Sequence, residues 1–173
     1  GPTGPQGNPG LQGPPGEEGP TGPTGPTGPI FPDSRLNGQK NLSSPEIIPA
    51  GAVITNFSPG SAFANLNFNI ATGVVTITIP GVYYMECSIS VDPSSNVPAS
   101  FGIVANNDPL NGFYMGSTTA GNVVSFSGTL SLNAGGTIRI HNASTTSVTL
   151  APLGTSILGP AIPTVNFIVY RIR

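Results

Sequence analysis

Glycine stands at every third position of the first thirty residues, and this strict period severely limits how that segment can fold. The positions are Gly1, Gly4, Gly7, Gly10, Gly13, Gly16, Gly19, Gly22, Gly25 and Gly28. Such a period is typical of three parallel polyproline-II chains wound around one axis, where only glycine fits. A flexible Gly/Pro linker is the alternative, but a linker has no reason to keep the period ten times. We therefore expect residues 1–30 to form a triple-helical rod of about 90 Å.

The ten Gly-X-Y triplets make a short collagen-like stalk, which we expect to be marginally stable alone. Four Y positions hold threonine: Thr3, Thr21, Thr24 and Thr27. A short triple helix needs a neighbouring unit that holds three chains together and raises their effective concentration. Residues 31–45 are polar and without a sustained period, so we interpret them as a neck. The trimerising unit is then expected in residues 46–173.

Composition excludes several classes of protein. The chain of 173 residues has 5 Lys plus Arg against 7 Asp plus Glu, and 7% of its residues are charged. This balance disfavours a nucleic-acid partner. Because 37% of residues are hydrophobic, the chain is not a charged disordered polymer either. No apolar run approaches the length needed to cross a bilayer, so we expect no membrane-spanning segment.

Residues after the neck alternate apolar with polar or small side chains. The clearest runs are Val74–Ile79, Tyr83–Val91, Val123–Leu132, Thr137–Asn142 and Val165–Ile172. They are rich in Val, Ile, Thr, Tyr and Phe and are bounded by Gly, Asn, Pro and Ser, as strands are. No stretch of ten or more residues has helical periodicity. We expect eight to ten short strands in an antiparallel sandwich or barrel.

The segment FNIATGVVTITIPGVYYMECSISV, from Phe68, resembles the central signature of the C1q/tumour-necrosis-factor jelly roll. The elements that carry the resemblance are Phe68-Asn69, Thr72-Gly73, Pro80-Gly81 and Gly81-Val82-Tyr83-Tyr84-Met85. Met85 stands where the family usually has Phe, and Val75 where an aromatic is common, although Met still fills a core position. The closing FIVYRI resembles the family's last strand, and AVITNFSPGSAFANLNFN more loosely resembles its opening strands. The resemblance implies an all-β antiparallel jelly roll of about ten strands.

This family forms threefold trimers, so the resemblance implies a trimeric head that would register the stalk. Residues 31–173 carry five positive and five negative side chains. A neutral surface suits burial against copies of the same chain, because charge is depleted in obligate interfaces. We expect core or trimer-interface roles for Tyr83, Met85, Phe167, Val169 and Ile172.

Threonine-bearing GPT triplets before such a head resemble the BclA-type collagen-like glycoproteins of the bacterial exosporium. The resemblance implies O-linked sugars on stalk threonines, with Thr3, Thr21, Thr24 and Thr27 as candidates, and a head that caps a filament on the spore surface. A viral or phage fibre with the same architecture would look much the same. An animal complement-like protein would more often show GxK or GER triplets, which are absent from this sequence.

Catalytic and metal-binding chemistry has little support in the sequence. Cys87 shares the expected core face of its strand, and His141 is the only histidine. The acids Asp33, Glu46, Asp92 and Asp108 leave open a calcium ion at the trimer apex, as in some relatives, but lone loop acids are more often solvated. We therefore expect that the chain is not an enzyme, has no catalytic residue and binds no cofactor.

The sequence-based interpretation is a structural homotrimer whose main partner is itself, at the outer surface of a spore or virion. Other surface-layer proteins, a host receptor or a glycan are further candidate partners. The competing interpretation is a C1q-like recognition head, for which no exposed arginine or aromatic cluster is visible.

Overall fold

A computed structural model of the chain describes residues 1–22, 33–59, 62–154 and 162–173. The chain divides into two compact units, Gly1–Ile30 and Phe31–Arg173. In the first unit, the described residues 1–22 hold no helix or strand, and all of them are exposed. Thr24, Thr27, Gly25 and Gly28 lie outside the described residues.

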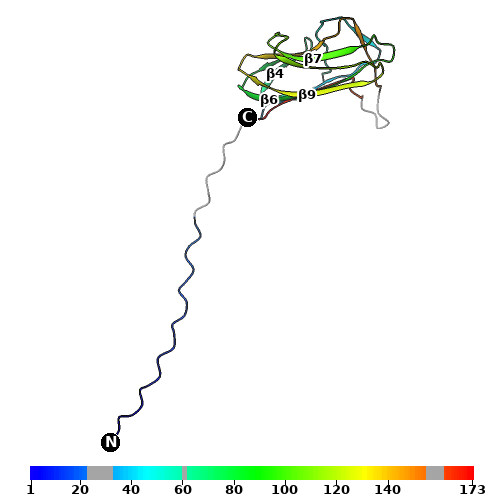
Figure 1. The fold of residues 1–173 in the computed structure, drawn as a ribbon. Helices are drawn as coiled ribbons and strands as arrows, with labels where there is room; N and C mark the ends of the chain where they lie inside the picture. The colour runs from blue at the N-terminus through cyan, green and yellow to red at the C-terminus, as the bar shows by residue number, and fades with distance from the viewer. Residues whose placement is uncertain (23–32, 60–61, 155–161) are drawn as a thin grey trace. The chain divides into compact units, whose positions relative to one another are not determined.

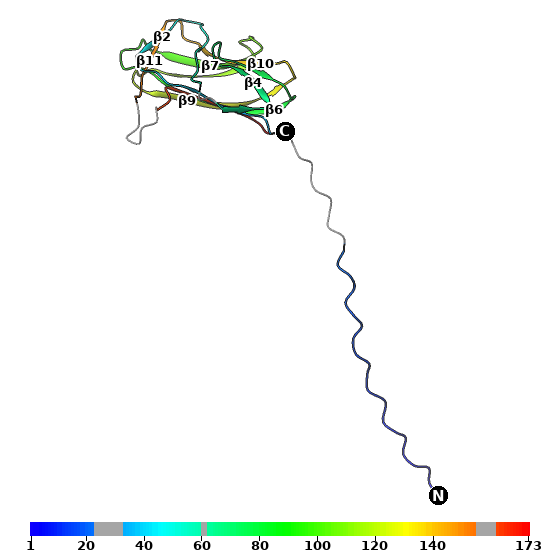
Figure 2. The same cartoon turned by 180° about the vertical axis from the view of Figure 1, so that it is seen from behind.

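The second unit, which we call the head, is a sandwich of two five-stranded antiparallel sheets (Figure 1). The first, the β6 sheet, has the strand order β3 (Ala62–Ala64), β1 (Arg35–Lys40), β12 (Val165–Arg171), β6 (Gly81–Ser90) and β9 (Val123–Leu132). The second, the β7 sheet, has the order β4 (Leu66–Asn69), β5 (Val74–Ile77), β10 (Thr137–Asn142), β7 (Ala99–Ala105) and β8 (Gly112–Ser117). A two-stranded ribbon pairs β11 (Val148–Leu150) with β2 (Glu46–Ile48); Figure 2 shows it beside the β7 sheet.

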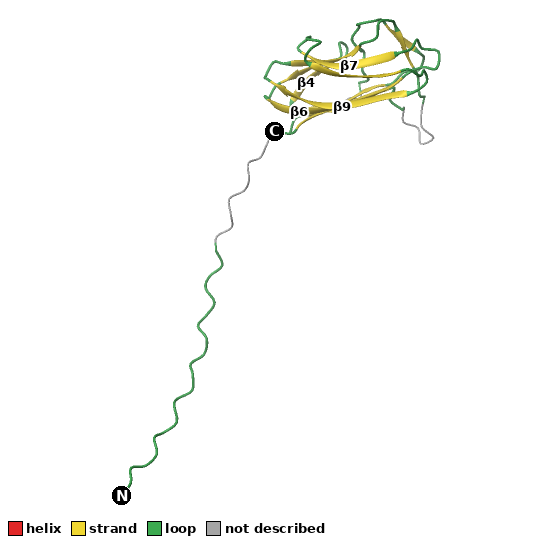
Figure 3. Cartoon of the chain, in the orientation of Figure 1, coloured by secondary structure: helices red, strands yellow, loops and turns green. Residues whose placement is uncertain are grey.

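The all-β prediction is confirmed over the described residues, where strands and loops alternate and no helix occurs (Figure 3). None of these residues belongs to a helix that would be long and apolar enough to cross a bilayer. The predicted spans of β9 and β10 agree with the structure, and those of β5, β6 and β12 differ from it only at their ends. Twelve strands are described rather than eight to ten, ten of them in the two main sheets.

The core lies between the two sheets, where the inward side chains of each strand meet. Alternation decides which side chains these are, because neighbouring residues of a strand point to opposite faces. The largest apolar side chains that are almost completely buried are Leu36, Ile54, Ile77, Tyr83, Met85, Ile89, Phe101, Ile103, Ile138, Ile140 and Phe167. Tyr83 keeps its hydroxyl satisfied by donating to the Ile79 carbonyl at 2.6 Å.

The prediction of a neck over residues 31–45 was wrong for Arg35–Lys40. These residues form β1, which pairs with β12 on one side and with β3 on the other. The inward positions of β1 are Leu36, Gly38 and Lys40, so only one of the three is a large apolar residue. Because β1 lacks the alternation of apolar and polar residues, its sequence does not predict a strand. Its place in the sheet comes from pairing with β12.

Lys40 is an almost completely buried cation at the end of β1. Its side chain is 2% exposed, and Nζ lies 2.9 Å from Oε2 of Glu46, whose side chain is 31% exposed. Nζ also donates to the carbonyls of Thr55, at 2.6 Å, and Asn56, at 3.3 Å. A buried ammonium is tolerated only when it is paired and hydrogen-bonded, and these contacts tie β1 to the start of β2 and to the 55–56 segment.

Candidate functional site

The outer face of the β6 sheet carries a cluster that we call the tyrosine face, made by Tyr84, Tyr170, Ile168 and Asn37. The pairing of β12 with β6 sets Tyr170 opposite Tyr84, and their ring centroids are 4.9 Å apart. Tyr170 is 41% exposed. A shallow cavity of about 470 Å³ between β1 and β12 is lined partly by Asn37, Ile168 and Tyr170.

The tyrosine face has few charges for a protein surface. Among the outward positions of β6 and β12, only Glu86 is charged, and its carboxylate accepts a hydrogen bond from the Tyr84 hydroxyl at 3.1 Å. Arg35 at the edge pairs with Asp33 at 2.6 Å. Asp33, Arg35 and Arg171 also line the cavity between β1 and β12, so charges lie at the rim of this face. Aromatic rings with a polar tip and a polar rim are typical of surfaces that become buried in protein contacts.

The predicted core or interface residues fall into two groups. The side chains of Tyr83, Met85, Phe167 and Val169 are completely buried between the sheets of a single chain. Ile172 lies after β12 and is 48% exposed, so it takes no part in that core. The first four residues therefore support the fold from inside, and only Ile172 has surface to offer a partner.

The stalk glycines have open space around them in the single chain. A Cβ atom built on any of the described ones, from Gly1 to Gly22, would have no neighbour within 4 Å. Nothing within one chain therefore requires the glycine period. Thr3 and Thr21 are exposed.

Cys87 and His141, the candidate nucleophile and base, are held apart by the fold. Cys87 is buried on β6, where desolvation and, secondly, the Glu86 carboxylate raise the pKa of its thiol far above the usual range. His141 lies on β10 of the other sheet, with its side chain on the outer face. A thiol with a raised pKa is a poor nucleophile, so the two residues do not form a catalytic pair.

The four acids considered as calcium ligands each have local roles. Asp33 and Glu46 pair with Arg35 and Lys40. Oδ1 of Asp92 accepts hydrogen bonds from the hydroxyl and the backbone N–H of Ser94, and these bonds lower the pKa of its carboxyl. Asp108 accepts from the backbone N–H of Leu110 at 3.0 Å. Within residues 1–22, 33–59, 62–154 and 162–173, no three His, Cys, Asp or Glu side chains are grouped to hold a metal ion.

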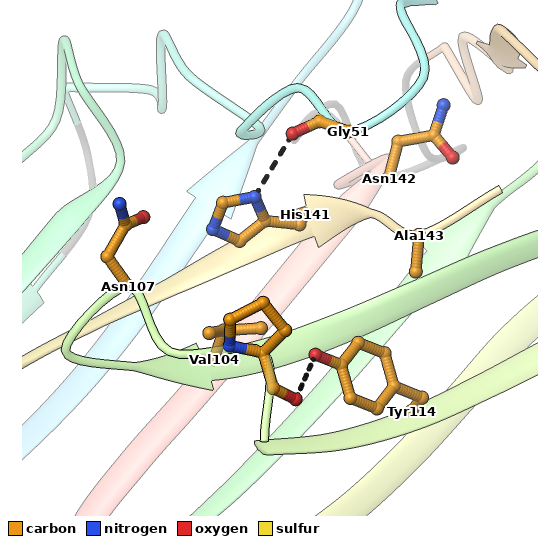
Figure 4. A pocket seen from close by; sticks show the side chains of 8 residues that line it. Gly51, Val104, Asn107, Tyr114, His141, Asn142 and Ala143 are labelled. Carbon is orange, nitrogen blue, oxygen red and sulfur yellow. Dashed lines mark hydrogen bonds between the residues drawn. The ribbon is translucent and has the colours of Figure 1, made fainter. Parts of the chain in front are cut away.

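A second cavity, which we call the His141 pocket, opens on the outer face of the β7 sheet (Figure 4). Its volume is about 460 Å³, and it is lined by Gly51, Val104, Asn107, Pro109, Tyr114, His141, Asn142 and Ala143. Strand pairing places His141 opposite Gly102, and Gly102 opposite Tyr114. Because Gly102 has no side chain, the Tyr114 ring can lie directly against the β7 backbone, on the same outer face as His141.

Hydrogen bonds fix the rings that line the His141 pocket. The Tyr114 hydroxyl donates to the Pro109 carbonyl at 2.8 Å, and His141 Nδ1 lies 3.2 Å from the Gly51 carbonyl oxygen. His141 Nε2 is buried and has no hydrogen-bond partner among the described residues. The pocket is thus preformed, and it contains an unsatisfied polar atom of the kind that calls for an explanation.

Solved structures with the same arrangement were found by comparison of the coordinates. Eiger TNF from S. frugiperda matches with a TM-score of 0.59 and 17% identity, over 83% of this chain and 94% of that one. Murine APRIL at pH 5.0 matches with a TM-score of 0.55 and 11% identity, over 80% and 99% of the two chains. The head is a jelly roll of the tumour-necrosis-factor type. The globular domain of zebrafish complement 1qA matches this jelly roll less closely, with a TM-score of 0.48, 18% identity, and coverage of 80% and 95%.

At the level of sequence, no family profile and no curated protein matches the chain. The jelly-roll assignment therefore rests on the strand order and on the superposed structures, and it confirms the fold that the signature from Phe68 predicted. The sequence analysis did not select Tyr114 or Asn107. A signal was present in β8, where Gly112 and Gly116 flank Tyr114 at the outward positions and leave it as the one side chain on that face of the strand.

Proposed function

We propose that the chain is a structural homotrimer, in which the jelly-roll head holds three copies together and registers a collagen-like stalk. The observation that carries the proposal is the unbroken glycine period of residues 1–30. The open space around Gly1 to Gly22 supports it, since a single chain has no steric need for these glycines. A triple helix requires glycine at every third residue, because each in turn meets the axis shared with two other chains.

In this proposal the tyrosine face packs against neighbouring copies. It offers aromatic and aliphatic area at Tyr84, Tyr170 and Ile168, and Glu86 is the one charged residue at the outward positions of β6 and β12.

The first test measures the mass of the full chain in solution by light scattering. We expect three times the 17.4 kDa chain mass. Tyr170→Glu would place a charge in the contact, and we expect it to give monomers. Leu110→Glu is the matched control, because Leu110 is 95% exposed on the β7–β8 loop, away from the tyrosine face. A monomeric parent chain, or a Tyr170→Glu variant that stays trimeric, would contradict the proposal.

The second test concerns the stalk. Gly13→Ala introduces a methyl group that meets nothing within its own chain, so any loss must come from packing between chains. We expect the low-temperature melting transition of the triple helix to fall while the mass stays that of a trimer. Gln12→Ala, at a Y position that points away from the axis, should leave the transition nearly unchanged. Equal melting of the two variants would exclude a triple helix.

The site of action that we propose is the outer surface of a spore, where the stalk would project the head. GPT triplets like those of exosporium glycoproteins support this, with Thr3, Thr21, Thr24 and Thr27 as sugar acceptors. Mass spectrometry of the protein isolated from its native particle should find hexose-containing additions on these threonines. Antibodies to the head should label intact spores; labelling of virions instead would favour the fibre alternative.

A further inference from the structure

We propose that the His141 pocket binds a neutral sugar ring. The site lies on the β7 sheet, and the tyrosine face lies on the β6 sheet, so this inference does not depend on the homotrimer.

Tyr114 forms a fixed aromatic platform at one side of the pocket. Its ring lies so close over Gly102 that a Cβ atom on Gly102 would collide with Cδ1 and Cε1. The Cδ1–Cε1 side of the ring therefore lies against the β7 backbone, while the residue as a whole remains 43% exposed. The hydroxyl bond to Pro109 fixes the ring at its far end. A flat, half-exposed aromatic ring held in this way is prepared to stack on a ligand at little entropic cost.

The residues that line the pocket include no carboxylate, ammonium or guanidinium group, because none of the eight is Asp, Glu, Lys or Arg. Arg139, outside the lining, already donates to Oδ1 of Asn107, so a ligand that carries a full charge would lose hydration with no lining charge to oppose it. The imidazole and amide groups equally disfavour a purely apolar ligand, which would leave them unsatisfied. The preferred ligand is uncharged, with an apolar face and several hydroxyl groups.

Asn107 and His141 provide the hydrogen-bonding groups opposite Tyr114. Asn107 uses Oδ1 to accept a long bond of 3.3 Å from Arg139, and its Nδ2 is available to donate. If Nδ1 of His141 carries the proton that it shares with the Gly51 carbonyl, Nε2 is an acceptor. Figure 4 shows Nε2 on the side of the ring that faces Asn107. Because Asn107 is exposed and weakly held, a small rotation would open Nε2 to a hydroxyl group.

One donor beside one acceptor matches a pair of neighbouring hydroxyl groups, since each hydroxyl both donates and accepts. The C–H face of the same sugar ring would then cover the phenol ring of Tyr114. The volume of about 460 Å³ lies within the ordinary range of small-ligand sites. Three segments far apart in sequence, around Gly51, Asn107 and His141, supply the lining and fix its shape.

The test uses the full chain and saturation-transfer NMR with methyl glycosides of glucose, galactose, mannose, rhamnose and N-acetylglucosamine. Each is added at about 10 mM, because a small ligand in a shallow site has a millimolar Kd. We expect at least one neutral glycoside to bind, with its ring C–H protons most strongly saturated. Glucuronate and glucosamine serve as charged probes. Binding only of a charged probe, or of none of the sugars, would overturn the proposal.

Two variants locate the site. Tyr114→Ala removes the platform and should weaken binding at least tenfold, whereas Leu110→Ala, in the neighbouring loop but outside the lining, should bind as the parent does. Gly102→Ala keeps the tyrosine but displaces its ring, and it should also weaken binding. Circular dichroism checks that each variant is folded. Unchanged affinity in a folded Tyr114→Ala or Gly102→Ala variant would show that the sugar binds elsewhere.

Discussion

The buried ion pair between Lys40 and Glu46 gives the sharpest test of how the head is held together. Glu46→Gln removes the negative partner but preserves the shape of the side chain. Lys40 Nζ would then have only neutral acceptors, namely the carbonyls of Thr55 and Asn56 and the amide oxygen that replaces the carboxylate. Breaking a fully buried ion pair lowers the free energy of unfolding by about 3–5 kcal/mol, because one charge is left uncompensated. Glu46 is 31% exposed, so water screens part of the interaction and we expect about 2 kcal/mol.

The assay is urea unfolding of the full chain followed by far-ultraviolet circular dichroism, since the chain has no tryptophan. With a slope of about 2 kcal/mol per M urea, the midpoint should fall by about 1 M. All variants are compared at one protein concentration, because association contributes to stability. Asp33→Asn is the matched control. It removes the exposed pair with Arg35, whose side chains are 67% and 59% exposed, and should cost less than about 0.5 kcal/mol.

A double-mutant cycle separates the pair from other effects. Lys40→Met alone leaves two carbonyls without their donor, and Glu46→Gln alone leaves a buried charge. The combined variant should be more stable than the sum of the single losses predicts, by about 1 kcal/mol or more. Two results would refute a stabilising pair. One is that Glu46→Gln lowers the free energy of unfolding no more than Asp33→Asn does. The other is that the double-mutant cycle gives no coupling energy between Lys40 and Glu46.

Three further predictions concern the interior. Cys87 should resist Ellman's reagent in the native chain and react fully in urea, because burial raises the pKa of its thiol; rapid native labelling would show that β6 opens readily. Asn142→Ala should lower the free energy of unfolding in urea by about 3 kcal/mol, since the two N–H groups of Nδ2 are shared among three backbone carbonyls; a loss below about 1 kcal/mol would mean that water replaces these bonds. Gly73→Ala should lower Tm by several degrees, because Gly73 has φ +70° and a Cβ would collide with the Ile54 carbonyl; an unchanged Tm would contradict this.

The strands that could be predicted are those whose two faces differ in polarity. In β10, Ile138 and Ile140 are buried while Thr137, Arg139 and His141 are only partly buried, and the sequence shows that alternation directly. The same rule places the side chain of His141 on the outer face of the sheet. Alternation is a local property, so it can be recognised without knowing which strand lies alongside.

The elements that were missed depend on distant partners. β1 presents Gly38 and Lys40 inward, and its place follows from pairing with β12, which local sequence does not contain. The His141 pocket forms only when the β7–β8 loop, the segment at Gly51 and the end of β10 meet. Gly112 and Gly116, two residues before and after Tyr114 in β8, marked an unusual surface, but they did not tell which side chain would lie beside Tyr114.

The pairing of β1 with β12 also has a consequence for the order of events during synthesis. Arg35 of β1 pairs with Tyr170 of β12, so β1 cannot join its sheet until β12 has been synthesised. Contacts between such distant residues slow folding. On a ribosome that has not yet reached Val165, β6 lacks its neighbour and offers an open edge to other nascent chains. Residues 1–30 leave the ribosome before the head does, so any assembly that the head directs begins only after β12 has been made.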